Sequence, residues 1–203
     1  MSEGRRPGEG RPAVDSLALV SDEVRRCTNC PLSMTRTCAV PGEGPPDAAV
    51  LIIGEGPGRN EDLLGRPFVG AAGKQLDGLL KCAGLNRDDV YITNVVKCRP
   101  PENRRPTDSE ADACGPYLER QIELLRPTVI VLLGDSALKR FLPDQTLSGA
   151  HGRSFTRDGL ALFPTYHPAA MIYNRTLEKV SAEDFKALGK FLAGLGPKSR
   201  PQA

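Results

Sequence analysis

Four cysteines are spaced in two pairs that suit metal binding. Cys27 and Cys30 form a C-x2-C pair, and Cys98 and Cys114 form a C-x15-C pair. The first pair can present two thiolates to one metal centre from a single turn, and the fold must bring the second pair to it. Four thiolates are the ligand set of either a [4Fe–4S] cluster or tetrahedral zinc, and the spacing alone does not choose between them.

The alternative is that the six cysteines of the chain are free thiols in the core, where cysteine is common. We expect Cys82 to be a core residue, because it lies close to the apolar face of a helix in "LLKCAGL". Cys38 could substitute as a ligand, but we expect it to take no part in metal binding. The sequence shows no export signal, so we expect a reducing compartment, which favours metal ligation over disulfides.

The glycine-rich stretch "GEGPGRNEDLLGRPFVG" (54–70) directly follows the apolar run "AAVLII" (48–53). It lacks the lysine of a P-loop, and Pro57 removes a backbone donor that a phosphate cradle would use. Carboxylates such as Glu55 and Glu61 combine better with Phe68 to bind a flat, neutral, polar ring, which the aromatic side chain would stack on. Taken alone, the stretch also suits a tight turn with solvated acids.

Asn94 and His167 are single polar residues at the ends of apolar runs. A buried carboxamide must satisfy both its oxygen and its nitrogen, and it can recognise a base edge through both. A neutral imidazole in "YHP" could donate to a developing oxyanion. The alternatives are an asparagine that bonds a neighbouring loop and a structural histidine. We assign no chemistry to His151.

The segment "KCRPPENRR" (97–105) has a local net charge of +3, from four basic residues against Glu102. It follows a predicted strand, so it could contact nucleic-acid phosphates beside a cleft. A solvated basic surface is the ordinary alternative. The basic residues of this segment, and those elsewhere that could extend it, are Lys97, Arg99, Arg104, Arg105, Lys139, Arg140, Arg153 and Arg175.

Composition and length limit the kinds of partner, location and domain organisation to expect. The 203 residues carry a net charge of +2, so a polyanion partner would need a local basic patch rather than a basic chain. No apolar run approaches the ~20 residues that span a bilayer, so we expect a cytoplasmic protein without membrane association. We expect flexible tails at 1–13 and 197–203 and a single domain over 14–196.

The apolar pattern predicts alternating strands and helices. The helix over 107–126 opens with the capping-box pattern of Thr107 and Glu110 and stops before Pro127, and a final helix has Ser181 as its N-cap. Alternation of this kind predicts a three-layer α/β/α sandwich with a central four-stranded, mostly parallel sheet. The predicted strands are 48–53, 90–96, 128–133 and 160–166.

The polar clusters all follow predicted strands. "GEGPG", "TNVVKC", "GDS" and "YHP" each come at the carboxyl end of one of the four runs. In an open parallel sheet these ends share one edge, where ligands bind in a crevice between the loops. We therefore expect the candidate residues to meet around one cleft.

Taken together, these motifs resemble the family 4 uracil-DNA glycosylases, the iron–sulfur branch of their superfamily. The resemblance runs from about Cys27 to Leu192, and its long first-loop motif with "TNVVKC" and "YHP" is specific. It implies a [4Fe–4S] cluster held by the four paired cysteines. The matching stretches are "C-x2-C", "TRT", "VPGEG", "GEGPGRNEDLLGRPFVGAAG", "TNVVKCRPP", "ACGPYL", "LLGDSAL" and "YHPAAMIYN".

The resemblance implies roles for the cleft residues. Deoxyuridine would be flipped out of DNA into the cleft, where Phe68 stacks on the base and Asn94 reads its edge. Glu61 and the small loop residues would crowd the C5 edge and exclude the methyl group of thymine. His167 and the backbone near Gly56 would stabilise the uracil anion as the glycosidic bond breaks.

The water activator stays open, because other branches carry an aspartate where this loop has Gly56. Glu55 and Glu61 are the candidates. The implied activity is that of a monofunctional glycosylase that leaves an abasic site and acts as a monomer on single- or double-stranded DNA. The alternatives are a non-catalytic iron–sulfur protein of redox or nucleic-acid-binding type, and a glycosylase that accepts a broader range of deaminated bases.

Overall fold

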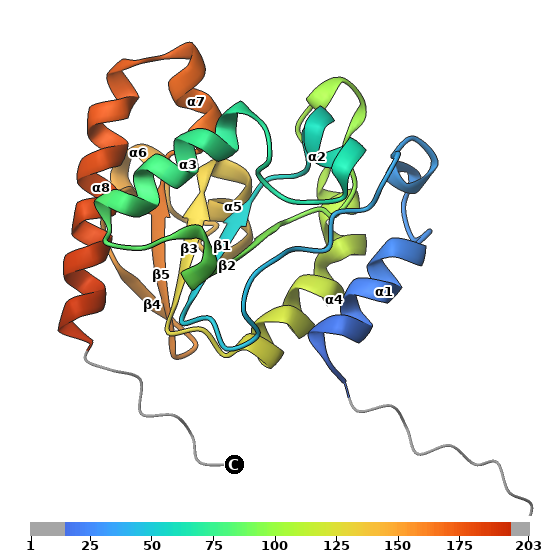
Figure 1. Ribbon diagram of the computed structural model, residues 1–203, viewed down its shortest axis with the longest axis horizontal. Coiled ribbons are helices and arrows are strands. Elements are labelled where there is room, and N and C mark those ends of the chain that lie inside the picture. The colour runs from blue at the N-terminus through green and yellow to red at the C-terminus, as the bar shows by residue number, and fades with distance from the viewer. Residues whose placement is uncertain (1–14, 196–203) are drawn as a thin grey trace, which may run out of the picture.

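One five-stranded sheet forms the centre of this computed structural model, which describes residues 15–195 (Figure 1). The strands lie in the order β2-β1-β3-β5-β4. The first four in this order are parallel, and β4 pairs antiparallel with β5. The strands are β1 (Val50–Gly54), β2 (Val90–Asn94), β3 (Val129–Leu133), β4 (Phe155–Arg157) and β5 (Leu160–Thr165).

The four predicted runs all form strands, and the predicted α/β fold class is confirmed. The predicted number of strands is wrong by one. The sequence gives little sign of β4, because it has only three residues, two of them exposed, at the edge of the sheet. A strand this short and exposed lacks the alternation of apolar and polar residues by which strands are recognised.

Helices cover both faces of the sheet, because successive strand residues point to opposite sides. Leu51 and Ile53 pack in a cluster with residues of α1, α4 and α5, whereas Val50 and Ile52 pack with residues of α3, α7 and α8. Figure 1 shows α1 with α4 and α3 with α8 on opposite sides of the strands. The helices are α1 (Leu17–Arg26), α2 (Arg59–Leu64), α3 (Ala71–Cys82), α4 (Asp108–Leu125), α5 (Gly134–Phe141), α6 (Leu147–Ala150), α7 (Pro168–Tyr173) and α8 (Thr176–Gly194). The 3-10 turns are η1 (Pro31–Met34), η2 (Arg87–Asp89) and η3 (Pro101–Asn103).

The predicted capping box at the start of α4 is present. The Thr107 side chain accepts the Glu110 N–H at 3.2 Å, and the Glu110 carboxylate accepts the Thr107 N–H at 2.8 Å. The helix ends at Arg126, whose φ of 46° reverses the chain before Pro127. These contacts satisfy backbone groups that a helix end leaves without partners.

Ser181 was predicted as the N-cap of the last helix, and this is wrong. α8 begins five residues earlier, at Thr176, and Ser181 is buried inside it. The Asn174 side chain accepts from the Thr176 N–H at 3.1 Å and from its hydroxyl at 2.6 Å, so the capping oxygen precedes the predicted position. Asn174 and Ser181 both have side chains that can cap a helix, and Asn174, the earlier of the two, lies at the start of α8.

The tails expected at 1–13 and 197–203, and the end positions of the expected 14–196 domain, lie outside the described residues. Among residues 15–195, no helix is both long enough and apolar enough to cross a membrane.

Candidate functional site

A cleft of about 650 Å³ opens beyond the carboxyl ends of the strands. The structure brings most of the predicted site residues to its walls, although they come from four separate segments of the chain. The predicted residues that line it are Glu55, Gly56, Glu61, Phe68, Asn94, Arg104, Arg105 and His167. Arg99 and Arg175, which were predicted to contact DNA phosphates, are not among the lining residues.

Asn94 lies at the end of β2 with its side-chain oxygen buried and without a hydrogen-bond partner. Its neighbour in the sheet register is Gly54. A Cβ on Gly54 would lie 2.4 Å from Asn94 Oδ1 and 2.8 Å from Cζ of Phe68. Glycine at 54 therefore allows the amide oxygen and the aromatic ring to approach the same point. A buried acceptor left free in a cleft wall is suited to an N–H donor on a ligand.

His167 caps α7 and is held as a neutral ring. Its Nδ1 accepts the Ala169 N–H at 3.2 Å, so the neutral tautomer carries its proton on Nε2. Burial lowers the pKa of His167 to about 4, against an opposing effect of the Glu61 charge. The His167 and Phe68 rings lie 5.6 Å apart between centroids and are tilted by 30°. The cleft thus contains a neutral N–H donor near an aromatic face.

Glu61 braces the loop that carries Phe68. Its Oε1 accepts the backbone N–H groups of Val69 and Gly70, each at 2.9 Å. The sequence suggested that Glu61 crowds a bound base or activates water. The structure adds a contact that sequence reasoning did not foresee, which occupies one oxygen of this carboxylate.

Glu55 belongs to a polar network at the side of the cleft. The Ser136 hydroxyl donates to Glu55 Oε2 and accepts from Arg105 Nε at 3.0 Å. Arg105 Nε also lies 4.0 Å from Glu55 Oε2. Sequence reasoning placed "GDS" at a strand end but assigned Ser136 no role. Tyr166, Asp135 and other lining residues were also missed, because loop packing rather than a motif brings them to the cleft.

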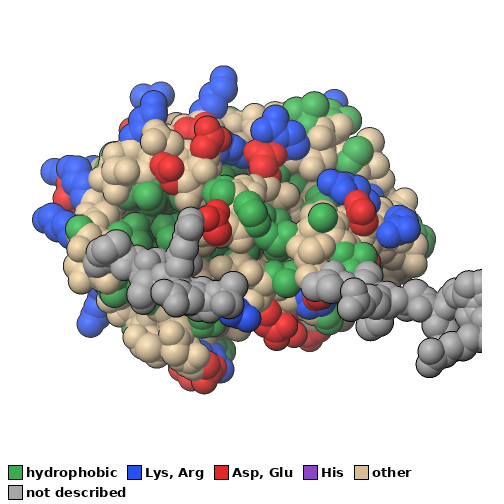
Figure 2. Space-filling view, turned by 60° about the horizontal axis from the view of Figure 1, so that its bottom comes forward, with side chains coloured by type: hydrophobic (Ala, Val, Ile, Leu, Met, Phe, Trp, Pro, Cys, Tyr) green, Lys and Arg blue, Asp and Glu red, His purple; other side chains and the backbone are tan. Residues whose placement is uncertain are grey.

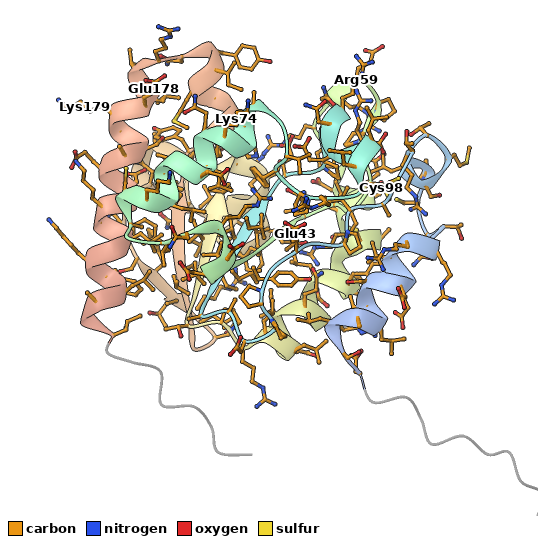
Figure 3. All side chains as sticks on the ribbon, in the orientation of Figure 1. Glu43, Arg59, Lys74, Cys98, Glu178 and Lys179 are labelled. Carbon is orange, nitrogen blue, oxygen red and sulfur yellow. The ribbon has the colours of Figure 1, made fainter. Side chains whose placement is uncertain are left out.

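The four paired cysteines line one small cavity. Three of their sulfurs accept N–H groups: Cys27 from the Asn29 backbone at 3.4 Å, Cys98 from Arg36 Nη1 at 2.9 Å, and Cys114 from the Lys97 backbone at 3.3 Å. Figure 3 labels Cys98 on the side of the molecule where α1 and α4 lie. N–H donors around sulfur are suited to stabilising thiolate ligands of a metal centre.

Within residues 15–195, no three His, Cys, Asp or Glu side chains converge as ligands for one metal ion. A [4Fe–4S] cluster does not need such convergence, since each thiolate binds a different iron. Cys38 does not line the cavity, and Cys82 is exposed at the end of α3, so the prediction that Cys82 is a core residue is wrong. Leu79 and Leu80 are buried and Ala83 packs against the same cluster, so the apolar face of α3 continues past Cys82, which does not lie on it.

Comparison with known proteins identifies the family. The profile of the uracil DNA glycosylase superfamily matches residues 41–192. This chain belongs to the uracil DNA glycosylase superfamily. A type-4 uracil-DNA glycosylase of Sulfurisphaera tokodaii is 48% identical over 185 residues, which cover 86% of this chain and 84% of the relative. That of Saccharolobus solfataricus is 46% identical over 190 residues, covering 89% and 88%, and that of Thermotoga maritima is 45% identical over 181 residues, covering 87% and 94%. The resemblance to this glycosylase branch is confirmed.

One basic residue near the glycosylase cleft was wrongly predicted to lie on the surface. Lys97 is 1% exposed, and its Nζ donates to Thr93 Oγ1 at 2.6 Å, to the Asn94 carbonyl at 2.7 Å and to Gln121 Oε1 at 2.8 Å. Burial lowers the pKa of Lys97 to about 8. This lysine therefore supports the strand that ends in Asn94, and it does not contribute to a basic surface.

The other basic residues considered for DNA contacts differ in their partners and in their exposure. Arg104 forms a bidentate pair with Glu110 at 2.7 and 2.8 Å, and Arg99 donates to Asn103 at 2.8 Å. Arg175 is exposed at the start of α8. Arg59 and Lys74 are both exposed and are labelled in the upper half of Figure 3, on α2 and α3. Figure 2 turns the opposite end forward, where the visible basic and acidic side chains are interspersed.

Proposed function

We propose that this chain is a monofunctional uracil-DNA glycosylase of base excision repair. It takes a deoxyuridine flipped out of DNA into the cleft, hydrolyses the N-glycosidic bond, releases uracil and leaves an abasic site. The observation that carries the proposal is the buried, unpartnered Oδ1 of Asn94, which lies beside the Phe68 ring in the cleft that also contains His167.

Asn94 reads the base in this proposal. Its Oδ1 accepts from N3–H of uracil, and its Nδ2 donates to O4. Cytosine presents the opposite pattern at these two positions, with an acceptor at N3 and a donor at N4, so it leaves both amide groups unsatisfied at a cost of ~1–3 kcal/mol each. Phe68 stacks on the ring, and the Glu61 side of the loop excludes the methyl group of thymine.

His167 stabilises the leaving group. As the bond between C1′ and N1 lengthens, negative charge gathers on uracil and positive charge on the sugar. The Nε2–H of neutral His167 and a backbone donor near Gly56 stabilise the uracil anion without a change of protonation. Because the pKa of His167 is about 4, the ring stays neutral throughout the physiological range. Water then attacks the sugar, with Glu55 and Glu61 as the candidate activators.

The tautomer of His167 follows from its position as a helix cap, since the Ala169 N–H fixes Nδ1 as an acceptor. Glu55 keeps one carboxylate oxygen engaged by Ser136, and Glu61 keeps one engaged by the loop backbone. Each carboxylate has a second oxygen that can orient a water molecule, so the contacts do not choose between them.

Cys27, Cys30, Cys98 and Cys114 hold a [4Fe–4S] cluster in this proposal. When bound, the cluster supplies iron–thiolate bonds that cross-link segments far apart in the sequence, which contributes to folding rather than to the chemical step. The Arg36 and backbone N–H groups that contact three of the sulfurs favour the thiolate form, whereas burial raises the pKa of the Cys98 and Cys114 thiols, so the bound iron must supply the rest of the thiolate stabilisation.

Uracil-containing DNA, single- or double-stranded, is the proposed substrate. Arg99, Arg104, Arg105 and Arg175 are the proposed phosphate contacts. Arg104 and Arg105 line the cleft, Arg99 donates to Asn103 in its wall, and Arg175 lies at the start of α8. A single domain over 14–196, a monomeric state and a cytoplasmic location complete the proposal, and all three stay predictions.

The decisive experiment incubates the purified protein with oligonucleotides that contain uracil, hypoxanthine or a thymine mispair, followed by alkali. Strand cleavage after alkali at uracil alone supports the proposal, and cleavage that needs no alkali contradicts a monofunctional mechanism. Cleavage of the hypoxanthine strand at a comparable rate would instead indicate a broader glycosylase. No cleavage of any strand would indicate a non-catalytic iron–sulfur protein.

A further inference from the structure

The backbone of Phe68 has an unfavourable conformation. Its φ of 51° lies in the left-handed region, which a bulky residue rarely adopts. α3 packs directly against this point: a Cβ on Gly73 would lie 1.8 Å from the Phe68 carbonyl oxygen. The Phe68 side chain lines the cleft while its carbonyl is turned toward α3. Such a conformation persists only where surrounding contacts impose it.

Arg87 supplies those contacts from outside the cleft. Its Nη1 donates to the Phe68 carbonyl at 3.0 Å, and its Nη2 donates to the Pro67 carbonyl. The guanidinium is itself oriented by two carboxylates, with Nε 3.7 Å from Glu43 and Nη1 3.4 Å from Asp77. Glu43 is labelled near the centre of Figure 3. Arg87 is not among the residues that line the cleft.

Two side chains thus hold the loop at consecutive backbone positions. Arg87 binds the carbonyls of residues 67 and 68, and Glu61 binds the N–H groups of residues 69 and 70. A planar guanidinium fork donates two bonds in fixed directions, so it can fix two neighbouring carbonyls at once. These contacts flank the Phe68 backbone on both sides.

We propose that Arg87 is a positioning residue for uracil excision, because it holds the left-handed backbone at Phe68 that places the aromatic ring beside Asn94 and His167. Arg87 does not touch the base, and acts on the reaction only through the ring. The inference rests on the proposed glycosylase function.

The test compares Arg87→Gln with Arg66→Gln in single-turnover excision of uracil from a duplex oligonucleotide. Arg66 is a matched control, because it also pairs with Glu43, at 2.6 and 2.9 Å, yet within residues 15–195 its side chain donates no hydrogen bond to the Phe68 backbone. Misplacement of the ring is expected to slow excision by roughly ten- to hundredfold in the Arg87 variant. The Arg66 variant should stay within about twofold of wild type, and Arg87→Lys should be intermediate, since it keeps the charge without the fork.

Two further measurements distinguish a positioning role of Arg87 from a general structural role. Affinity for an abasic-site duplex, which offers no base to Phe68, should change less than about twofold in Arg87→Gln. In a background of Phe68→Leu, Arg87→Gln should add little to the loss, because both changes remove the same stacking contact. If Arg87→Gln does not fold, the same three measurements are made on Arg87→Lys.

The proposal is overturned if the Arg87 variant excises uracil as fast as the Arg66 variant. It is also overturned if abasic-site affinity falls by the same factor as excision, or if the losses at Arg87 and Phe68 multiply. Absence of excision by the wild-type protein would refute the proposed function and this inference with it. An active wild type with an unaffected Arg87 variant refutes the inference alone.

Discussion

Gly54→Ala is predicted to disable the cleft while leaving the fold in place. The new methyl carbon would lie 2.4 Å from Asn94 Oδ1, 2.8 Å from Phe68 Cζ and 2.9 Å from Phe68 Cε2, whereas ordinary contacts begin at 3.4 Å. The amide oxygen must therefore move by about 1 Å and the ring by about half as much. A displacement of this size costs ~100-fold in rate, or about 2.7 kcal/mol of transition-state stabilisation. Overpacking of the buried strand costs a further ~1–3 kcal/mol of folding stability.

The assay is single-turnover excision of uracil at saturating enzyme, with thermal unfolding measured in parallel. Gly78→Ala is the matched control, since a Cβ there meets nothing within 4 Å. That variant should excise uracil at the wild-type rate and be more stable by roughly 0.5–1 kcal/mol, because alanine is preferred in helices. Excision by Gly54→Ala within threefold of wild type would refute the reasoning that Asn94 and Phe68 converge on the base.

Three more predictions follow from charged groups and sulfurs. His167 has a pKa of about 4 in the folded protein against 6.5 when unfolded, so the unfolded state takes up its proton first and folding stability should fall as pH drops from about 6.5 to 4. In chemical denaturation, His167→Ala should show a smaller fall of stability over this pH range than wild type. An equal fall would contradict the neutral, buried state of His167. Lys97→Met should lower the free energy of unfolding in urea by about 2–4 kcal/mol, because three buried acceptors lose their donor. The control Lys139→Met, at an exposed position, should change it by less than ~0.5 kcal/mol. Equal effects of the two changes would contradict the buried role of Lys97. Cys98→Ser should lose bound iron and acid-labile sulfide in metal analysis while Cys82→Ser keeps both, and iron retained by Cys98→Ser would exclude the proposed ligand set.

Much of the fold could be predicted from the sequence, because its strands are short apolar runs followed by glycine or polar residues. Parallel pairing then brings the strand ends to one edge, and this alone suggested that Phe68, Asn94 and His167 share a cleft. β4 could not be predicted in the same way, since two of its three residues are exposed at the sheet edge. The start of α8 was displaced because Asn174 provides a capping oxygen ahead of Ser181.

The supporting contacts of the site could not be read from the sequence. Counting charges places Lys97 on a basic surface, whereas its burial depends on acceptors from β2 and α4 that only the fold assembles. Arg87 carries no motif, and its contacts with the Phe68 backbone arise from the approach of η2 to the loop. Sequence motifs identified the side chains that face the cleft. The residues that support those side chains, such as Lys97 and Arg87, are brought into place by tertiary packing.

The most direct test of the account is Asn94→Ala, measured for both excision of uracil and affinity for an abasic-site duplex. Excision is expected to fall at least ~100-fold, since the base loses its hydrogen-bonding partner, while duplex affinity stays within about twofold. Excision near the wild-type rate in this variant would show that the free amide oxygen of Asn94 does not recognise uracil, and would contradict the central claim.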